Sequence, residues 1–208
     1  MAHRLMKQIN KIDMKILIDN GHGHNTKGKQ SPDGTLREYA YTREIAKRLL
    51  GELQKLGYDV ELVTPESYDV SLTTRVIRIN KICKQIGSSN VLVISLHNNA
   101  AGNGSQWMSA RGWSAHVGLN ASKNSKRLAS CLAKAAEEEG LKVRRPLPKQ
   151  DYWLQNLAIC RDTLCPAVLT ENLFQDNKED VRFLLSEDGK NTIVRLHVKG
   201  IQDYIDGK

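Results

Sequence analysis

The chain has 208 residues, of which 40% are hydrophobic, and a formal net charge of +8. This length and apolar content are typical of one globular domain with its own core. Its longest apolar run is well short of the roughly 20 residues that a membrane helix needs, so the sequence predicts no membrane span. The charge favours a polyanionic partner, either an anionic cell-wall polymer or a nucleic acid. Aromatic residues make up only 5% and are not interleaved with the basic ones, which argues against nucleic acid.

The first 13 residues carry positive charge but no apolar segment of the kind found in a secretory signal peptide. We interpret residues 1–13 as an extension, or a remnant of an expression vector, ahead of a single domain that spans residues 14–208. The four cysteines have neither the density nor the spacing of a disulfide scaffold, and we expect reduced thiols. One pair among them, Cys160 and Cys165, is a weak candidate for half of a zinc site.

The first predicted strand ends in a glycine-rich turn. Ile16, Leu17 and Ile18 are consecutive apolar residues, as expected for a strand covered on both faces of a parallel sheet. The segment 19–23, DNGHG, follows directly, and its two glycines permit a sharp turn. The turn therefore presents His22 at the carboxyl end of the strand, which is the edge where open α/β sheets bind ligands.

The next elements are a turn-rich loop over 25–34 and a helix predicted over 36–56. Glu38 lies in the first turn of this helix and projects from the same stripe as the apolar residues Ile45 and Leu49. A carboxylate on the core-facing side of a helix is costly unless another group pairs with it. Glu38 is therefore either a cap of its own helix or, as we favour, a metal ligand.

Periodicity predicts the rest of the chain as alternating strands and helices. The strands are 58–63, 91–97 and 112–117, the helices are 71–85, 125–140, 177–185 and 193–204, and two short apolar runs cover 157–160 and 167–171. This order predicts an α/β fold with a central, mostly parallel, twisted sheet of about six strands and helices on both faces.

Side chains that can ligate a metal ion or transfer a proton follow several of these apolar runs. His97 ends the run 91–97 and Glu171 ends the run 167–171, so both can join His22 and Glu38 at one edge of the sheet. Two imidazoles and one carboxylate leave an open position on a tetrahedral Zn²⁺, which is the mark of a catalytic zinc site. Glu171 then suits the role of proton-transferring base. His116, in the strand 112–117, is a weaker candidate ligand because a lone strand histidine is more often a hydrogen-bonded structural residue.

Five separated segments also carry a resemblance to a family. In order, they are IDNGHGH, LREYAYTREIAKRL, VSLTTRVIRIN, VLVISLHNNA and CPAVLTENLF, and together they span nearly the whole of residues 14–204. They resemble the zinc-dependent N-acetylmuramoyl-L-alanine amidases, cell-wall hydrolases of bacteria and of phage endolysins. The resemblance implies an α/β fold, Zn²⁺ as cofactor and peptidoglycan as substrate, cut at the amide bond between N-acetylmuramic acid and the L-alanine of the stem peptide.

The resemblance also implies roles for individual residues. It implies that His22, Glu38 and His97 hold the zinc and that Glu171 is the catalytic glutamate. Arg161 matches a family position that is commonly arginine, and we expect it to hold the substrate or to orient Glu171. The chain departs from the family pattern at position 24, which usually holds a small residue. We expect His24 to be either a polar lid over the site or a rival metal ligand.

Two other functions stay open on the sequence alone. One is a zinc exopeptidase of related fold that acts on free peptides, and the other is a non-catalytic module that binds wall polymers or nucleic acid through Arg144 and Arg145. Glu171 argues against the second, because a pure binder has no use for a buried base. An enzyme of the cell wall acts in the periplasm or outside the cell. Without a signal peptide, we expect either phage-type release or a shortened form of a secreted enzyme.

Overall fold

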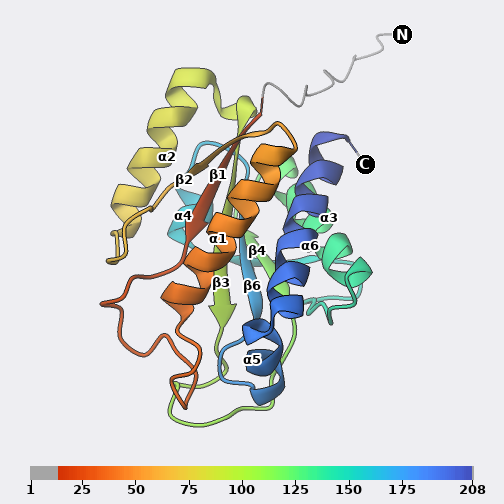
Figure 1. The fold of residues 1–208 in the computed structure, drawn as a ribbon. Helices are drawn as coiled ribbons and strands as arrows, with labels where there is room; N and C mark the ends of the chain where they lie inside the picture. The colour runs from red at the N-terminus through yellow and green to blue at the C-terminus, as the bar shows by residue number, and fades with distance from the viewer. Residues whose placement is uncertain (1–13, 208) are drawn as a thin grey trace.

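The computed structural model describes residues 14–207, so the expected extension 1–13 lies outside the described residues. Within residues 14–207, six strands form one sheet in the order β2-β1-β3-β6-β4-β5 (Figure 1). The strands are β1 (Lys15–Asn20), β2 (Asp59–Leu62), β3 (Val91–Asn99), β4 (Ser114–Gly118), β5 (Tyr152–Gln155) and β6 (Ala167–Phe174). The helices are α1 (Glu38–Lys55), α2 (Leu72–Ile86), α3 (Lys123–Glu138), α4 (Ala158–Arg161), α5 (Lys178–Leu185) and α6 (Glu187–Ile205), and a 3-10 turn covers Ser88–Asn90.

The sheet is mixed but mostly parallel, which confirms the predicted α/β fold. β1, β2, β3 and β6 run in one direction, β4 pairs antiparallel with β6, and β5 is parallel to β4. Two details differ from the expectation. Most of the apolar run 157–160 belongs to the short helix α4, and β5 covers residues for which the sequence predicted no strand. β5 is an edge strand whose side chains are half-buried or exposed, so it lacks the continuous apolar run of a central strand.

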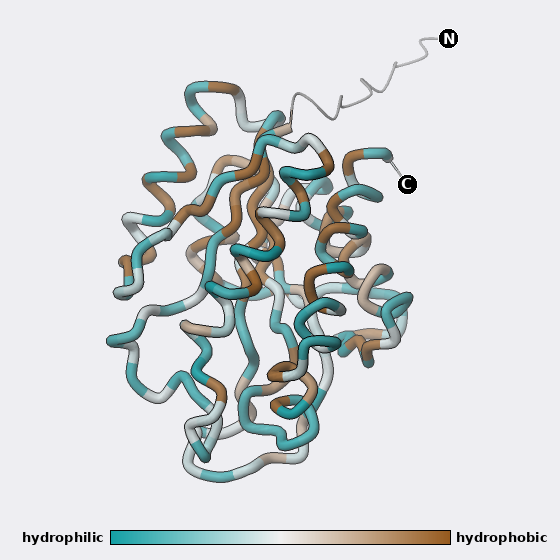
Figure 2. Tube along the Cα trace, in the orientation of Figure 1, coloured by the Kyte–Doolittle hydropathy of each residue, from teal (hydrophilic) through white to brown (hydrophobic). Residues whose placement is uncertain are grey.

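Side chains alternate between two cores along the central strands. Ile16 and Ile18 belong to the larger core, under α1, α3 and α6, whereas Leu17 belongs to the smaller core under α2 and α4. Figure 2 shows the same arrangement, with the hydrophobic part of the trace concentrated in the central strands and hydrophilic loops at the ends. Burial on both faces explains why these strands read as unbroken apolar runs. None of the helices in residues 14–207 is both long enough and apolar enough to cross a bilayer.

His197 of α6 is the most deeply buried histidine in residues 14–207. Its side chain is 0% exposed, its Nδ1 lies 2.7 Å from the carbonyl oxygen of Ile193, and its Nε2 lies 3.0 Å from the hydroxyl of Thr170. A ring whose Nδ1–H donates to Ile193 and whose Nε2 accepts from Thr170 is neutral. Burial lowers the pKa of His197 to about 4.

The low pKa of His197 predicts that the folded state loses stability in acid. Because the pKa of His197 is about 4 in the folded state and 6.5 as the ordinary value, its stabilising contribution is full above pH 6.5 and disappears as the pH falls toward 4. We expect the difference in unfolding free energy between the protein and a His197→Gln variant to shrink by about 2 kcal/mol from pH 7 to pH 5. Urea denaturation at the two pH values measures it, and a constant difference would contradict the assignment.

Candidate metal centre

His22 is placed by two glycines that have no room for a side chain. A Cβ built on Gly21 would lie 2.5 Å from Cε1 of His97, and one on Gly23 would lie 1.9 Å from the backbone nitrogen of Asp69. His22 itself has a φ of 59°, in the left-handed region that few residues other than glycine adopt. The turn after β1 therefore packs directly against both β3 and the loop before α2, and this packing aims the His22 imidazole at the edge of the sheet.

A buried ion pair supports the two strands that carry the histidines. Arg75 of α2 donates to the carboxylate of Asp19 at 2.7 Å and to the carbonyl oxygen of Asn20 at 2.6 Å, and both charged side chains are almost fully buried. The second oxygen of Asp19 accepts from the hydroxyl of Ser95 at 2.6 Å. Sequence reasoning missed this network, and its only signal was an acidic residue directly after the apolar run of β1. Loss of either partner would leave an uncompensated buried charge.

His22, Glu38 and His97 meet at the carboxyl edge of the sheet. Their potential ligand atoms all lie within 4.8 Å of one another. Oε1 of Glu38 lies 3.1 Å from Nδ1 of His97 and accepts the backbone amide of Asn98 at 2.9 Å, while Oε2 lies 3.5 Å from Nε2 of His22. The two imidazole rings are nearly perpendicular, with centroids 5.0 Å apart. Three residues separated by 16 and 59 positions in the chain thus form one cluster.

The three residues fit a divalent metal ion. Oε2 of Glu38 is buried and has no hydrogen-bond partner, which leaves a carboxylate oxygen free for an ion. With one ligand atom from each residue, the three atoms lie within 4.8 Å of one another, which is wider than the spacing of about 3.3 Å between ligand atoms around a tetrahedral zinc with bonds of about 2.0 Å, so the side chains would draw together around an ion. Burial lowers the pKa of His22 to about 4, so its imidazole is neutral at pH 7. Neutral imidazole is the form that ligates metal.

Glu38 and His97 each shift the pKa of the other. Burial opposes ionisation of Glu38, whose side chain is 1% exposed, but the hydrogen bond and charge of His97 outweigh it and lower its pKa. Burial likewise opposes protonation of His97, and the hydrogen bond to Glu38 outweighs it and raises the pKa of His97. Each group therefore stabilises the charge of the other, and a bound cation would take over the role of the imidazolium beside Glu38.

Glu171 stands beside this cluster on the neighbouring strand. In the parallel pairing of β3 and β6, Glu171 is the register partner of His97, so the two side chains emerge on the same face of the sheet. Burial raises the pKa of Glu171 to about 7. Its Oε2 is buried and has no hydrogen-bond partner in the described residues. Glu171 is thus a buried carboxyl group whose protonated form is favoured by burial, and none of its hydrogen bonds goes to another described side chain.

Arg161 is not brought to this cluster. Its exposed guanidinium bonds to Asp162 and Asn156, and it lines a cavity together with Ser88 and Pro166, near the amino ends of β3 and β6. Pro166 precedes Glu171 by five residues, which corresponds to about 17 Å along an extended strand. Arg161 therefore makes no contact with Glu171 in this structure, and its role in holding the substrate stays a prediction.

The other histidine candidates and the cysteines also lie outside the three-residue cluster. Nε2 of His116 lies 3.0 Å from the hydroxyl of Ser114, and the His116 ring stacks on Trp153. His24 is exposed, with its ring centroid 6.4 Å from that of Tyr39. All four cysteines are free thiols.

A cavity opens from the cluster along the face of the sheet. It has a volume of about 340 Å³ and runs between α2 and α4, bounded by His22 and His97 at one end. Most of its wall is apolar, with Val70, Leu72 and Leu157 among the lining residues. It is thus a mostly apolar cavity next to the candidate metal ligands, the kind of site that commonly binds a ligand.

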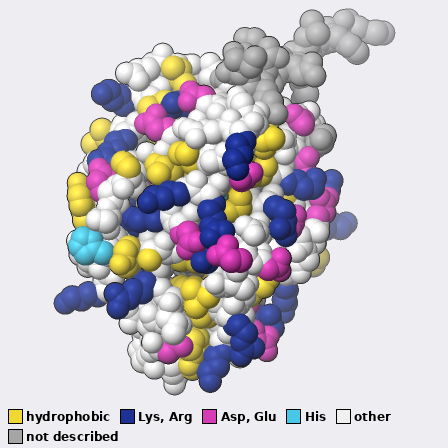
Figure 3. All heavy atoms as spheres, in the orientation of Figure 1, with side chains coloured by type: hydrophobic (Ala, Val, Ile, Leu, Met, Phe, Trp, Pro, Cys, Tyr) yellow, Lys and Arg dark blue, Asp and Glu magenta, His cyan; other side chains and the backbone are white. Residues whose placement is uncertain are grey.

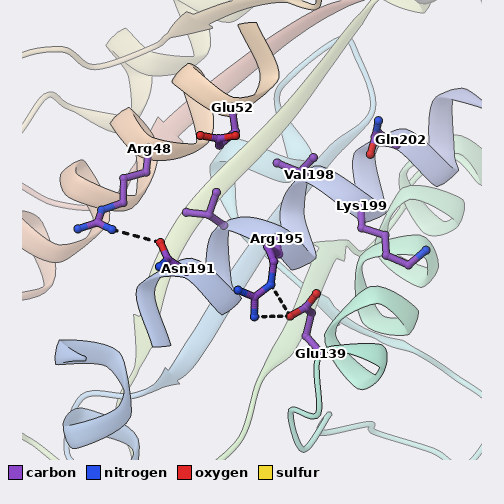
Figure 4. Close-up of a pocket in the computed structure, with 9 residues that line it drawn as sticks. Arg48, Glu52, Glu139, Asn191, Arg195, Val198, Lys199 and Gln202 are labelled. Carbon is purple, nitrogen blue, oxygen red and sulfur yellow. Dashed lines mark hydrogen bonds and ion pairs between the residues drawn. The ribbon is translucent and has the colours of Figure 1, made fainter. Parts of the chain in front are cut away.

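A larger hollow of about 610 Å³ lies elsewhere, between α1 and α6 (Figure 4). Its polar side chains are paired with one another, as Arg195 is with Glu139 and Arg48 with Asn191. Arg48 is ten residues along α1 from Glu38, which corresponds to about 15 Å of helix. Figure 3 shows basic and acidic side chains interspersed over this side of the molecule. The hollow therefore contains neither the metal ligands nor a basic patch.

The packing of Gly21 against His97 predicts a large effect of one methyl group. We expect Gly21→Ala to lower the affinity for zinc by about 10- to 100-fold, because the new Cβ would displace the imidazole that it meets at 2.5–2.9 Å. Gly51→Ala is the matched control, since a Cβ there meets no atom within 4 Å. Zinc titration of both variants measures the effect, and equal affinities would show that His97 is not a ligand.

Comparison with known proteins identifies the family. The family model described as N-acetylmuramoyl-L-alanine amidase matches residues 16–203. The chain belongs to this family. It is 25% identical over 193 residues to the endolysin of Bacillus phage SPP1, covering 93% of this chain and 66% of that protein. It is also 25% identical over 193 residues to the probable cell wall amidase LytH of Staphylococcus saprophyticus, covering 92% and 58%.

Solved structures of amidases share the fold. An N-acetylmuramoyl-L-alanine amidase from Clostridium difficile 630 superposes with a TM-score of 0.79 at 25% identity, covering 95% of this chain and 99% of that one. The amidase Ami1 of Mycobacterium smegmatis gives a TM-score of 0.82 at 15% identity, covering 96% and 100%, and shows the likeness of fold alone. The chain spans about half to two thirds of the length of the curated relatives it matches.

Proposed function

We propose that the protein is a zinc-dependent peptidoglycan hydrolase that cleaves the amide bond between N-acetylmuramic acid and the L-alanine of the stem peptide. The observation that carries this proposal is the position of Glu171, a buried carboxyl group, beside three side chains that could hold a metal ion, one of which, His97, is its register partner on β3. Membership in the N-acetylmuramoyl-L-alanine amidase family supports the choice of bond.

The chain's own residues divide the work of amide hydrolysis. His22, Glu38 and His97 hold the ion and leave a position open toward the substrate. A bound Zn²⁺ would polarise the scissile carbonyl and lower the pKa of a water molecule to about 7. Glu171 accepts the proton of the attacking water and then donates it to the nitrogen of L-alanine as that amine leaves. The hydroxyl group of the water ends on the lactyl carbonyl carbon as the bond from that carbon to nitrogen breaks, and the proton ends on the leaving amine, so the products are a carboxylic acid and a free amine.

The place of action follows from the substrate. We infer that the protein acts at the cell wall, in the periplasm or outside the cell. The relatives described as a phage endolysin and as a probable cell wall amidase support this inference. The net charge of +8 also suits contact with anionic wall polymers, although Figure 3 shows no single basic patch on the side that it displays.

Product analysis on purified walls tests the function. We expect loss of turbidity with release of free amino groups of L-alanine and with no new reducing sugar ends. A defined muramoyl-peptide should be cleaved, and the same peptide without the sugar should not. Reducing ends would indicate a glycosidase instead, and cleavage of the sugar-free peptide would indicate an exopeptidase.

A further inference from the structure

Lys29 occupies a fixed position beside the metal ligands, in the loop between β1 and α1. Its backbone carbonyl accepts the amide of Glu38 at 3.0 Å, which holds the residue against the first turn of α1. The loop that follows β3 packs on the same segment, since a Cβ on Gly104 would lie 3.5 Å from the carbonyl oxygen of Gly28 and 3.7 Å from that of Gln30. The hydrogen bond to the first turn of α1 and the close approach of Gly104 therefore hold the backbone around Lys29.

The ammonium group of Lys29 is a cation without a partner in residues 14–207. The side chain is half-buried, and it makes no hydrogen bond or ion pair with another described side chain. Its charge nevertheless lowers the pKa of both His22 and Glu171, so it lies within electrostatic reach of the metal ligands and of the base. Arg43, another cation near the turn, donates from Nε to the carbonyl oxygen of Glu66 and from Nη1 to that of Gly21, and its Nη2 is buried, so it is held against the backbone.

A free cation at this position fits an anion supplied by the substrate. Neither carboxylate of the site pairs with Lys29. Glu38 faces the two histidines, and Glu171 serves the proton transfer. On the sugar side of the scissile bond N-acetylmuramic acid contributes no charge once its carboxyl group is in the amide. The stem peptide on the other side carries free carboxylates, which can also occur as carboxamides.

We propose that Lys29 binds a carboxylate of the stem peptide and makes the enzyme prefer a substrate with that carboxylate free over one in which it is amidated. This inference rests on the proposed function and names a specificity determinant within it. A charge-assisted hydrogen bond from an ammonium to a carboxylate is about twice as strong as a neutral one. Replacement of the carboxylate by a carboxamide removes the charge but keeps the shape, so it isolates the interaction.

The test compares two muramoyl-peptides that differ only in whether the carboxyl group next to L-alanine is free or amidated. We expect the wild-type protein to show about a 10-fold lower KM for the free carboxylate. Lys29→Gln should raise that KM by about 10-fold, to the value for the amidated peptide, while the KM for the amidated peptide, kcat and zinc content stay the same. Lys27→Gln, an exposed lysine two residues away, is the matched control and should change neither KM.

The outcomes separate this inference from the function on which it rests. A wild-type enzyme with equal KM for the two peptides overturns the role of Lys29 but leaves the amidase function intact. A Lys29→Gln variant that lowers kcat equally on both peptides places Lys29 with the metal or with Glu171 and also overturns carboxylate binding. A wild-type protein that cleaves neither peptide removes the proposed function, and this inference with it.

Discussion

Replacement of Glu171 by glutamine is expected to lower kcat by about 10²- to 10⁴-fold, the range that general acid–base catalysis contributes. The carboxamide has nearly the same shape as the carboxylic acid but cannot accept the proton of the attacking water. Because Glu171 stands beside the ligand cluster rather than within it, zinc content and KM should not change. Turnover of a defined muramoyl-peptide and metal analysis of the purified variant measure these effects.

The matched control for this substitution is Glu61→Gln, which neutralises an exposed carboxylate that pairs with Lys15 on the surface of the sheet. We expect it to retain the activity of the wild-type protein. A Glu171→Gln variant that keeps more than half of the wild-type kcat would show that another group transfers the proton. A variant that loses its zinc would instead make Glu171 a fourth ligand.

The fold was predictable because its central strands are covered on both faces. Burial under α1 on one face and α2 on the other makes β1 and β3 mostly apolar up to the sheet edge, apart from Lys15 at the start of β1 and the hydrogen-bonded pair Asp19 and Ser95. The first polar residues after each run therefore mark that edge. His22 and His97 are recognisable in the sequence for this reason, and Glu38 is recognisable because it occupies a core-facing position of a helix.

The features that sequence reasoning missed depend on contacts between distant segments. Arg75 and Asp19 are 56 positions apart, and the pattern of α2 gives no sign that one of its arginines lies under the sheet edge. α4 is only four residues long and buries only Ile159, too little for a periodicity to emerge. Arg161 lies in the sequence between two active-site segments, yet α4 places it toward the opposite end of β6. Proximity along the chain is a poor guide to proximity at the edge of a parallel sheet.

Removal of one metal ligand has a different signature from removal of the base. We expect His22→Asn to abolish both stoichiometric zinc binding and detectable activity, because one nitrogen ligand is lost from a set of three. Asparagine is a suitable replacement, since it tolerates the left-handed backbone that His22 adopts at a φ of 59° and should leave the turn intact. Zinc should also cease to raise the melting temperature, because ligand binding stabilises only a folded state that retains the site.

His24→Asn provides the matched control two residues further along the same turn. His24 is exposed and lies outside the three-residue cluster, so this variant should keep one zinc per chain, the zinc-dependent rise in melting temperature and full activity. The pair of variants thereby decides which histidine of the G-H-G-H segment is the ligand. If His22→Asn kept its zinc while His24→Asn lost it, the loop would have to rearrange on metal binding, and the geometry of the unliganded cluster would not describe the working enzyme.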